Sequence, residues 1–522
     1  MLHLCDRSRP RVPDCIILDQ PHTTTGMRST SLLLGLILFS SALIVAAADY
    51  DTFTNSKIKR RIEASTATVK HTLAIDYKGN GNKYHLTLLN PSKVAYLNVT
   101  TNLGQELKTT YNGEHTTNGL TYGSYLVELP SGDSGKLKVI AIYSHVLRPF
   151  PEKIAQNEKQ LVIFEDNHYI VSPYETTEQT TTIDLSSDRI ESKSEKSPTS
   201  ANGKRITYGA YNNIKPFSSS PLKVHFENNA PFLTVKKYLR LVEISHWGNI
   251  AIEDSFDITH TGAKLKTNFN RAEYQRNQNG APAHIAKMKE YLPNGAVDVY
   301  YRDNIGNIST SNFNENAKPP TLEFQPRTML FGGWRIQFEN GYNLPSDKYL
   351  FRDNQDSSRY VLNVPFVAQL EDAVYDEVEI KFILPEGVKK AEISTPFSLD
   401  SETIGKHYTY LDTSGRTTIT ITKRNVVADY NTKPFQVSYH FSRSSLLQEP
   451  ILLISTWFSF FVFVMVLSRF QFRIGKPVVV VPPPAAKGDQ MKTGVAQLGE
   501  LMRLLYSSTS SLLAYPSTSK QL

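Results

Sequence analysis

Histidine and cysteine, which often serve as nucleophiles, general bases and metal ligands, are sparse in this sequence. Its 522 residues include 13 histidines, and no two of them lie within five positions of each other, so no HExxH zinc site occurs. The only cysteines are Cys5 and Cys15. A GxSxG nucleophile turn and a GxxxxGK[ST] phosphate loop are also missing from the sequence. These patterns predict a protein without a catalytic residue of these types, a metal site or a cofactor.

Carboxylates are the catalytic group that the sequence supplies in quantity. A glycosidase places two Asp or Glu side chains about 5–9.5 Å apart across the scissile bond. Asp303 and Glu386 lie near expected turns and are the candidates for such a pair. Because 50 of the 522 residues are acidic, nothing singles these two out. The favoured interpretation is that both are solvated loop carboxylates.

Aromatic side chains could instead stack on sugars or on extended peptides. A dense group lies in LFGGWRIQFENGYNLP, residues 330–345. The adjacent pair Gly332 and Gly333, among its three glycines, lacks the spacing and the following helix of a phosphate-binding loop. Apolar and polar residues alternate from Trp334 to Phe338, which predicts a strand, and residues 339–341 predict a turn after it. The stretch is therefore interpreted as strand and turn rather than as a ligand loop.

The elements that would hold these residues are predicted to be strands. Apolar and polar side chains alternate in EVEIKFIL (377–384) and in RTTITIT (416–422), which is typical of half-buried strands. Helical periodicity is rare outside the apolar runs described below. The best case is APAHIAKMKEYL (281–292), which predicts a short helix. We therefore predict a mainly β fold.

A weak internal repeat divides this β region in two. IEAS (62–65) and VEIS (242–245) each precede an apolar strand pattern and a glycine turn. The repeat indicates two tandem β-sandwich-like domains, 49–233 and 234–445. Residues 186–204 are almost without apolar side chains, which predicts a mobile excursion of the first domain.

The first apolar run predicts a signal peptide. Arg28 follows Met27, an apolar core comes next, and three alanines end at Ala48, so cleavage is expected before Asp49. The residues before Met27 are rich in charge and proline and fit no signal peptide. We therefore assign residues 1–48 to a signal peptide that starts at Met27 and is preceded by an upstream extension.

The second apolar run, residues 450–468, predicts a transmembrane helix. Its 19 residues carry no charge and would span about 28 Å as a helix, close to the thickness of the hydrocarbon layer. Arg469, Arg473 and Lys476 follow it. Because the positive side faces the cytosol, residues 469–522 are expected to form a short basic cytosolic tail. The predicted topology is that of a single-pass type I membrane protein with the bulk of the chain lumenal.

Charge and cysteine content exclude some partners and compartments. The formal net charge is +7, of which residues 469–522 contribute seven Lys or Arg against two acidic residues, and residues 1–48 contribute four Arg against three Asp. The rest of the chain carries only +1, which gives it no surplus to attract nucleic acid. Both cysteines precede the predicted cleavage site, so the mature protein would have none, unlike most extracellular receptors. This composition suits the endoplasmic reticulum.

Two tripeptides predict N-glycosylation sites if the region is lumenal. They are NVT at Asn98 and NIS at Asn307, whereas the third candidate, at Asn90, is blocked by the following proline.

Several long stretches resemble the ribophorin I family. They run in order from about residue 55 to residue 474 and are rich in Trp, Tyr and Gly: EKQLVIFEDNHYIVSPY (158–174), SHWGNIAIEDSFDITHTGAKLK (245–266), DVYYRDNIGNIST (298–310), LFGGWRIQFENGYNLP (330–345), ILPEG (383–387), HYTYLDTSGR (407–416) and LLQEPILL (446–453). The match around RDNIGNIST favours Asn307 as the occupied sequon.

The resemblance implies a subunit of the endoplasmic reticulum oligosaccharyltransferase. That complex transfers a preassembled glycan from dolichol pyrophosphate to the Asn of Asn-x-Ser/Thr in nascent proteins, and a different, multi-spanning subunit holds its catalytic site. This chain would then be a non-catalytic accessory subunit of the membrane complex. Its expected partners are the catalytic and other subunits, nascent polypeptides and the translocon. Family members carry a long helical cytosolic region that faces the ribosome, but only 54 residues follow Ser468 here, so a ribosome contact is not carried over.

Two other classes stay open at this point. A lumenal carbohydrate-binding or carbohydrate-active β-sandwich protein would use the abundant aromatic and acidic residues. A cell-surface adhesion receptor would share the topology, although the missing disulfides count against it.

Overall fold

The computed structural model describes residues 53–130, 134–276, 282–409 and 412–470. The predicted cleavage site at Ala48 and Asp49 lies outside these residues, as does nearly all of the predicted tail. The chain forms two compact units, Met1–Leu452 and Leu453–Leu522, and each is described by itself.

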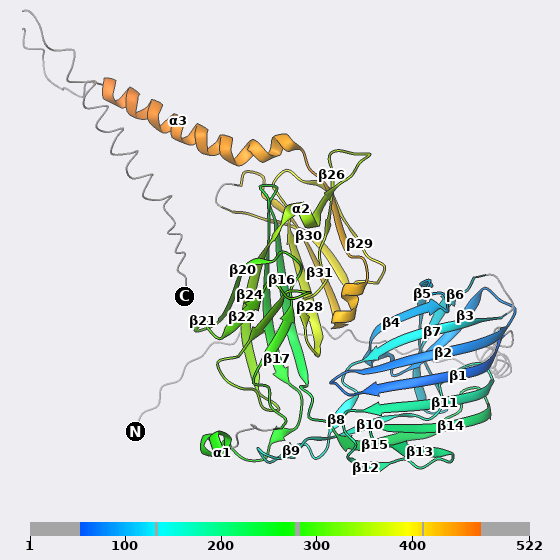
Figure 1. The fold of residues 1–522 in the computed structure, drawn as a ribbon. Helices are drawn as coiled ribbons and strands as arrows, with labels where there is room; N and C mark the ends of the chain where they lie inside the picture. Colours follow the sequence, from blue (N-terminus) through cyan, green and yellow to red (C-terminus); the bar gives the residue numbers. More distant parts are fainter. Residues whose placement is uncertain (1–52, 131–133, 277–281, 410–411, 471–522) are drawn as a thin grey trace, which may run out of the picture. The chain divides into compact units, whose positions relative to one another are not determined.

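The first half of the larger unit is built on a seven-stranded sheet, coloured blue to green in Figure 1. In β2, buried residues alternate with more exposed ones, so one face of the sheet packs inward. In spatial order the strands are β13 (Thr199–Asn202), β14 (Arg205–Ile214), β11 (Thr176–Leu185), β1 (Phe53–Ala64), β2 (Val69–Gly79), β7 (Ser134–Tyr143) and β4 (Val94–Thr101).

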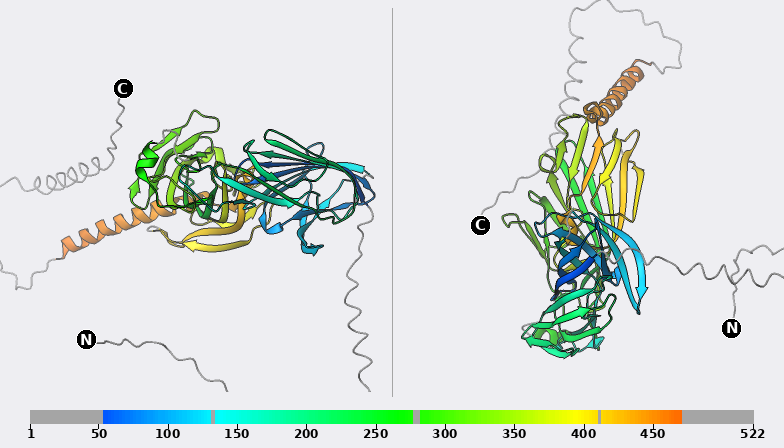
Figure 2. Two further views of the ribbon diagram at one scale, coloured as in Figure 1. Left: turned by 90° about the horizontal axis from the view of Figure 1, so that it is seen from below. Right: turned by 90° about the vertical axis from the view of Figure 1, so that its right-hand side faces the viewer.

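Two smaller sheets accompany it, and the two views of Figure 2 show them from further sides. One has the order β3 (Lys83–Leu89), β6 (Leu120–Glu128) and β5 (Thr109–Thr117). The other has the order β12 (Ile190–Lys193), β15 (Pro221–Glu227), β10 (Leu161–Asn167) and β8 (Leu147–Pro149). The cores between these layers are two clusters of buried apolar side chains contributed by residues 53–232.

The second half is built on an eight-stranded sheet. Its order is β21 (Gly306–Asn307), β20 (Val297–Asp303), β24 (Arg335–Pro345), β17 (Asn249–His260), β16 (Leu233–Ile244), β28 (Ala373–Ile383), β31 (Arg416–Val427) and β30 (Ser401–His407). Two four-stranded sheets accompany it: β22 (Ser311–Asn314), β23 (Thr321–Phe324), β19 (Met288–Tyr291) and β27 (Gln369–Leu370); and β25 (Leu350–Arg352), β26 (Arg359–Asn363), β32 (Gln436–His440) and β29 (Lys389–Ser394).

The remaining elements are short, apart from the last helix. β9 (Lys153–Ile154) pairs in parallel with β18 (Lys264–Leu265) and so joins the two halves. Within the described residues the short helices are α1 (Arg271–Arg276), α2 (Ser346–Tyr349) and the 3₁₀ turns η2 (Pro91–Lys93), η3 (Ala428–Thr432) and η4 (Arg443–Leu447). The long helix α3 (Gln448–Arg469) contains the whole of the predicted span 450–468. A helical stretch Arg443–Arg469 has a mean hydropathy of 2.3, so it is long and apolar enough to cross a membrane.

The two large sheets share one connection pattern. β1 pairs antiparallel with β2 and parallel with β11, just as β16 pairs antiparallel with β17 and parallel with β28. The repeated IEAS and VEIS sequences lie at the ends of β1 and β16. The mainly β fold is therefore confirmed, and the repeat marks equivalent strands of two similar sheets. The predicted boundary at residue 234 stays a prediction.

Three local predictions were wrong. Residues 288–291 of the predicted helix 281–292 form strand β19, because Met288 and Glu290 are buried against the neighbouring sheet while their neighbours in sequence are not. The predicted turn at 339–341 lies within the continuous strand β24. The predicted excursion 186–204 contains β12 and β13, whose backbone groups pair with β15 and β14. In each case pairing with neighbouring strands, rather than the local sequence pattern, decides the structure.

Candidate functional site

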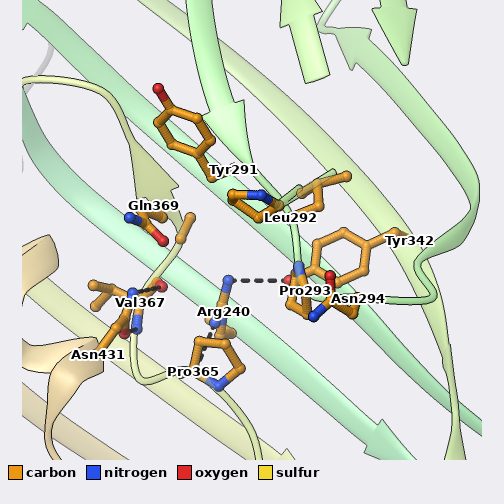
Figure 3. A pocket seen from close by; sticks show the side chains of 12 residues that line it. Arg240, Tyr291, Leu292, Pro293, Asn294, Tyr342, Pro365, Val367, Gln369 and Asn431 are labelled. Carbon is orange, nitrogen blue, oxygen red and sulfur yellow. Dashed lines mark hydrogen bonds between the residues drawn. The ribbon is translucent and has the colours of Figure 1, made fainter. Parts of the chain in front are cut away.

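A cavity of about 220 Å³ in the second half is the most distinctive candidate site. Its wall contains one charged side chain, Arg240, and Figure 3 shows this side chain among prolines, amides and tyrosines. The lining residues are Arg240, Tyr291, Leu292, Pro293, Asn294, Pro319, Tyr342, Pro365, Val367, Ala368, Gln369 and Asn431. The Asn431 amide is itself held, since it bonds both the backbone N–H and the carbonyl of Val367 at 3.0 and 2.9 Å.

Arg240 belongs to a buried polar row that crosses the eight-stranded sheet. On neighbouring strands, Asn340 of β24 lies opposite Asp254 of β17, which lies opposite Arg240 of β16. The Arg240 guanidinium donates from Nε and Nη2 to the two Asp254 oxygens, both at 2.7 Å. It also donates from Nη1 to the Pro365 carbonyl at 2.8 Å, and the Tyr238 hydroxyl donates to Asp254 at 2.7 Å. The charge of Arg240 is therefore neutralised inside the protein by a bidentate pair.

A second carboxyl, Glu290, reaches the same row from the facing sheet. The Asn340 amide donates to its Oε2, which ties β24 to β19. Burial raises the pKa of Glu290 to about 8, and the nearby Asp254 charge adds to the shift. Among the described residues, Glu290 Oε1 and Asn340 Oδ1 are both buried without a partner. A proton on Glu290 Oε1 turns this oxygen from an acceptor without a donor into a donor itself. We therefore infer that Glu290 is a neutral carboxylic acid paired with the Asn340 amide.

The cavity offers mainly neutral hydrogen-bonding groups. Its one charge is already paired, and the other polar groups of its lining are neutral amides and phenols. Such a lining offers hydrogen-bond donors and acceptors together with proline and tyrosine surface, which fits a neutral polar ligand such as an extended peptide segment. In the described parts of the chain, no three His, Cys, Asp or Glu side chains gather as a metal site.

The first half has a counterpart of Arg240. Arg60 lies three positions before Glu63, as Arg240 lies three positions before Glu243, and both arginines sit on the central strand of a large sheet. The Arg60 guanidinium is buried, pairs with Asp166 and donates to the Asn167 carbonyl at 2.7 Å. A buried arginine–carboxylate pair is thus common to both sheets.

The structure separates the two candidate carboxylates, Asp303 and Glu386. The cross-strand pairs lead from β20 to β28. Asp303 of β20 lies opposite Phe338 of β24, which lies opposite Phe256 of β17. Phe256 lies opposite Tyr238 of β16, and Tyr238 lies opposite Val378 of β28. Four strand spacings are about 19 Å, and the five residues of β28 that follow Val378 add about 16 Å along the strand before the chain reaches Glu386. A glycosidase pair at about 5–9.5 Å is therefore excluded.

Each of these carboxylates is also held by its own partners. The Arg327 guanidinium bonds both Asp303 oxygens at 2.7 and 3.0 Å and holds the pKa of Asp303 at about 2. Burial acts to raise the pKa of Glu386, but hydrogen bonds from Ser414 and Thr413 outweigh it and leave the pKa below its ordinary value. A general acid needs a raised pKa, so neither group is suited to that role. The expectation of solvated carboxylates is corrected for Glu386, which is buried.

The aromatic stretch 330–345 packs within the fold, and one of its rings, Tyr342, also lines the cavity around Arg240. Phe331 and Trp334 pack edge to face at 5.3 Å between ring centres, and Phe269 contacts both rings. Gly341 lies where a side chain would meet the Tyr300 ring, since an added Cβ would come within 2.4 Å of it. Gly341, which was predicted to form a turn, therefore lies within a strand, where the absence of a side chain lets the Tyr300 ring pack against the backbone.

The two sequons occupy different environments. Asn307 is exposed on β21, at the edge of the eight-stranded sheet. Asn98 is half-buried on β4, where its Nδ2 donates to Glu106 at 3.3 Å and its Oδ1 accepts from Lys433 at 3.1 Å. The Asn98 amide is thus part of a contact between the two halves, whereas Asn307 faces open solvent.

The buried arginines were missed in the sequence, although a signal for them existed. In β16 the buried side chains are Tyr238, Arg240, Val242 and Ile244, so Arg240 falls in phase with apolar residues. A charged residue on the apolar face of a strand requires a buried partner, which Asp254 provides.

Comparison with known proteins identifies the family of the chain. The profile of one protein family, Ribophorin I, matches residues 53–468. The chain is 41% identical to dolichyl-diphosphooligosaccharide–protein glycosyltransferase subunit 1B of Oryza sativa subsp. japonica, over 69% of this chain and 76% of that protein. It is 35% identical to subunit 1A of Arabidopsis thaliana (86% and 75% covered) and 34% identical to subunit 1 of Caenorhabditis elegans (84% and 76% covered).

A solved structure of leukotriene A4 hydrolase from Saccharomyces cerevisiae matches 35% of this chain and 30% of its own length at 13% identity, with a TM-score of only 0.22. The family profile matches residues 53–468 of this chain, and each relative named above is matched over more than two thirds of both sequences. The chain belongs to the ribophorin I family.

Proposed function

We propose that this chain is a non-catalytic accessory subunit of the endoplasmic reticulum oligosaccharyltransferase, which transfers a preassembled glycan from dolichol pyrophosphate to Asn-x-Ser/Thr of nascent proteins. The observation that carries the proposal is the match to relatives named as subunit 1 of this glycosyltransferase, over 69–86% of the chain. The separation of Asp303 from Glu386 and the paired charge of Arg240 support a role other than catalysis.

Purification of the complex through a tag on this chain tests the proposal. We expect a multi-spanning catalytic partner and transfer activity to co-purify in mild detergent, and the isolated β region to be inactive on its own. Transfer or hydrolysis of a glycan by the isolated region would contradict the accessory role, and a tagged chain without a multi-spanning partner would contradict membership of the complex.

The membrane topology of the proposed subunit is type I, with the two β regions in the lumen. It is supported by the basic residues that follow the span, Arg469, Arg473 and Lys476. In intact microsomes, added protease should leave a protected fragment that lacks only the tail. Digestion of the β regions without detergent would reverse the orientation.

The cavity around Arg240 is the proposed contact for nascent polypeptide. A segment passing over an accessory subunit must be bound without regard to its charge, and the neutral amide, phenol and proline lining meets that need. Gln369 is an exposed residue of this lining, so Gln369→Ala should alter the glycosylation of some substrates and leave the assembly of the complex unchanged.

Asn307 is proposed as the principal glycosylated residue of the chain. Asn307→Gln should remove one endoglycosidase-sensitive step in gel mobility, because Asn307 is exposed at a sheet edge. Asn98→Gln is the matched control and should leave the mobility unchanged, because the Asn98 amide is engaged by Glu106 and Lys433. The reverse pattern would contradict this assignment.

A further inference from the structure

Large apolar side chains are exposed at the end of the second half at which α3 begins. Trp247, in the turn between β16 and β17, and Tyr408, after β30, are both 65% exposed, and Leu447, directly before α3, is 51% exposed. We call these three residues the aromatic end. Scattered single apolar residues are ordinary on a surface, whereas a contiguous exposed apolar patch marks an interaction site.

Contacts place them around one hollow. Trp247 lines this hollow together with Leu446, Glu449 and Arg416. The Tyr408 ring packs over Gly415, the residue before Arg416, since a Cβ added to that glycine would lie 2.6 Å from the ring. Leu447 directly follows Leu446, a lining residue of the same hollow. The aromatic end is therefore one surface patch.

The same patch holds the first residues of α3. Gln448 Nε2 donates to Thr413 Oγ1 at 2.7 Å, and Arg416 Nη2 donates to Glu449 at 3.0 Å. The uncharged run starts at the next residue, Pro450. At about 1.5 Å per helical residue, the boundary of the hydrocarbon layer lies within about one helical turn of these bonds. The chain itself therefore brings the aromatic end to the membrane surface.

The charges at this end fit phospholipid head groups. Its carboxylates Glu243, Asp412 and Glu449 are each paired with Arg416. Three exposed cations at the same end, Lys389, Lys390 and Arg443, form no ion pair with any residue that the structure describes. With Glu386, which lines the same hollow, the four carboxylates equal Arg416 and the three exposed cations in number, so no charge surplus results. The cations are nevertheless the exposed members of this set that form no ion pair among the described residues, and they can meet lipid phosphates.

We infer that the aromatic end rests in the lipid interface of the membrane that α3 crosses, with Trp247 and Tyr408 at head-group level and the three cations facing lipid phosphates. Tryptophan and tyrosine favour this layer because their rings are apolar at one end and polar at the other. The contact fixes the second β region against the bilayer and so holds the Arg240 cavity at a constant distance from the membrane surface. The inference rests on the proposed topology.

Tryptophan fluorescence tests it, because the chain has only three tryptophans. Full-length variants with one tryptophan each are placed in phosphatidylcholine nanodiscs with and without bromine on the upper acyl chain. Trp247 remains in Trp334→Phe/Trp457→Phe, Trp457 in Trp247→Phe/Trp334→Phe, and Trp334 in Trp247→Phe/Trp457→Phe. Circular dichroism confirms the β content of each variant.

We expect the brominated lipid to lower the emission of Trp247 about twofold, because its ring lies at the boundary of head groups and acyl chains. Trp457, within the span, should be quenched at least as strongly, whereas Trp334 should be unaffected, since it precedes the β24 strand whose far end pairs near Trp247. Quenching of Trp457 without quenching of Trp247 would overturn the inference and leave the topology standing. Loss of quenching at Trp457 would overturn the membrane span and the inference together.

Discussion

Replacement of Asp254 by alanine is expected to destabilise the protein by about 3–5 kcal/mol, the usual cost of leaving one member of a buried ion pair alone. Arg240 is 1% exposed and Asp254 is fully buried, so water cannot replace the lost carboxylate. The substitution also leaves the Tyr238 hydroxyl without its acceptor. Chemical denaturation of the purified chain, followed by circular dichroism, measures the loss.

Asp257→Ala is the matched control on the same strand. Asp257 pairs with Arg335, and the Asp257 side chain is 14% exposed while the Arg335 side chain is 59% exposed. Water can therefore solvate the guanidinium that Asp257→Ala leaves behind, and the denaturation midpoint should fall far less than in Asp254→Ala. The double variant Arg240→Met/Asp254→Leu removes both charges and should recover most of the stability. Equal midpoints for Asp254→Ala and Asp257→Ala would contradict the importance of the buried pair.

Apolar–polar alternation in the sequence was sufficient to predict many strands, but not which strands pair with each other. β28 and β31 alternate regularly because one face of each packs on a core, and that alternation is a local property. β19 could not be predicted, since four residues gain strand structure only from β23 and β27 beside them. β24 was interrupted in the prediction because Asn340 and Gly341 resemble a turn, while their actual environment comes from Asp254 and Tyr300.

One contact of the candidate site could be predicted from the sequence, and another could not. In the β16–β17 hairpin, Arg240 and Asp254 lie seven residues on either side of Trp247, so a hairpin centred on this tryptophan pairs them. That contact was therefore present in the sequence once the turn was located. The bond between Glu290 and Asn340 joins two different sheets, and no local pattern encodes the packing of one sheet on another. A contact between side chains of two packed sheets can be identified only in the folded structure.

Glu290→Gln is expected to remove a pH dependence from the stability of the fold. Burial raises the folded-state pKa of Glu290 from 4.5 to about 8, so the native state holds a proton that the unfolded chain releases. This contribution to stability is complete below about pH 4.5 and is lost as the pH rises through about 8. Between these values, the native chain loses stability relative to Glu290→Gln by about 1.4 kcal/mol per pH unit.

Glutamine tests the protonation state because it resembles the neutral carboxylic acid in shape and still pairs with the Asn340 amide. From about pH 5 to about pH 7.5, we expect the free energy of unfolding of Glu290→Gln to rise relative to that of the native chain by on the order of 3 kcal/mol. Glu323→Gln, on the neighbouring strand β23 with an exposed side chain, controls for the loss of one carboxylate. Parallel stability curves for the native chain and Glu290→Gln would mean that Glu290 is ionised in the folded protein, and Asn340 would then face a buried charge with no cation bonded to it.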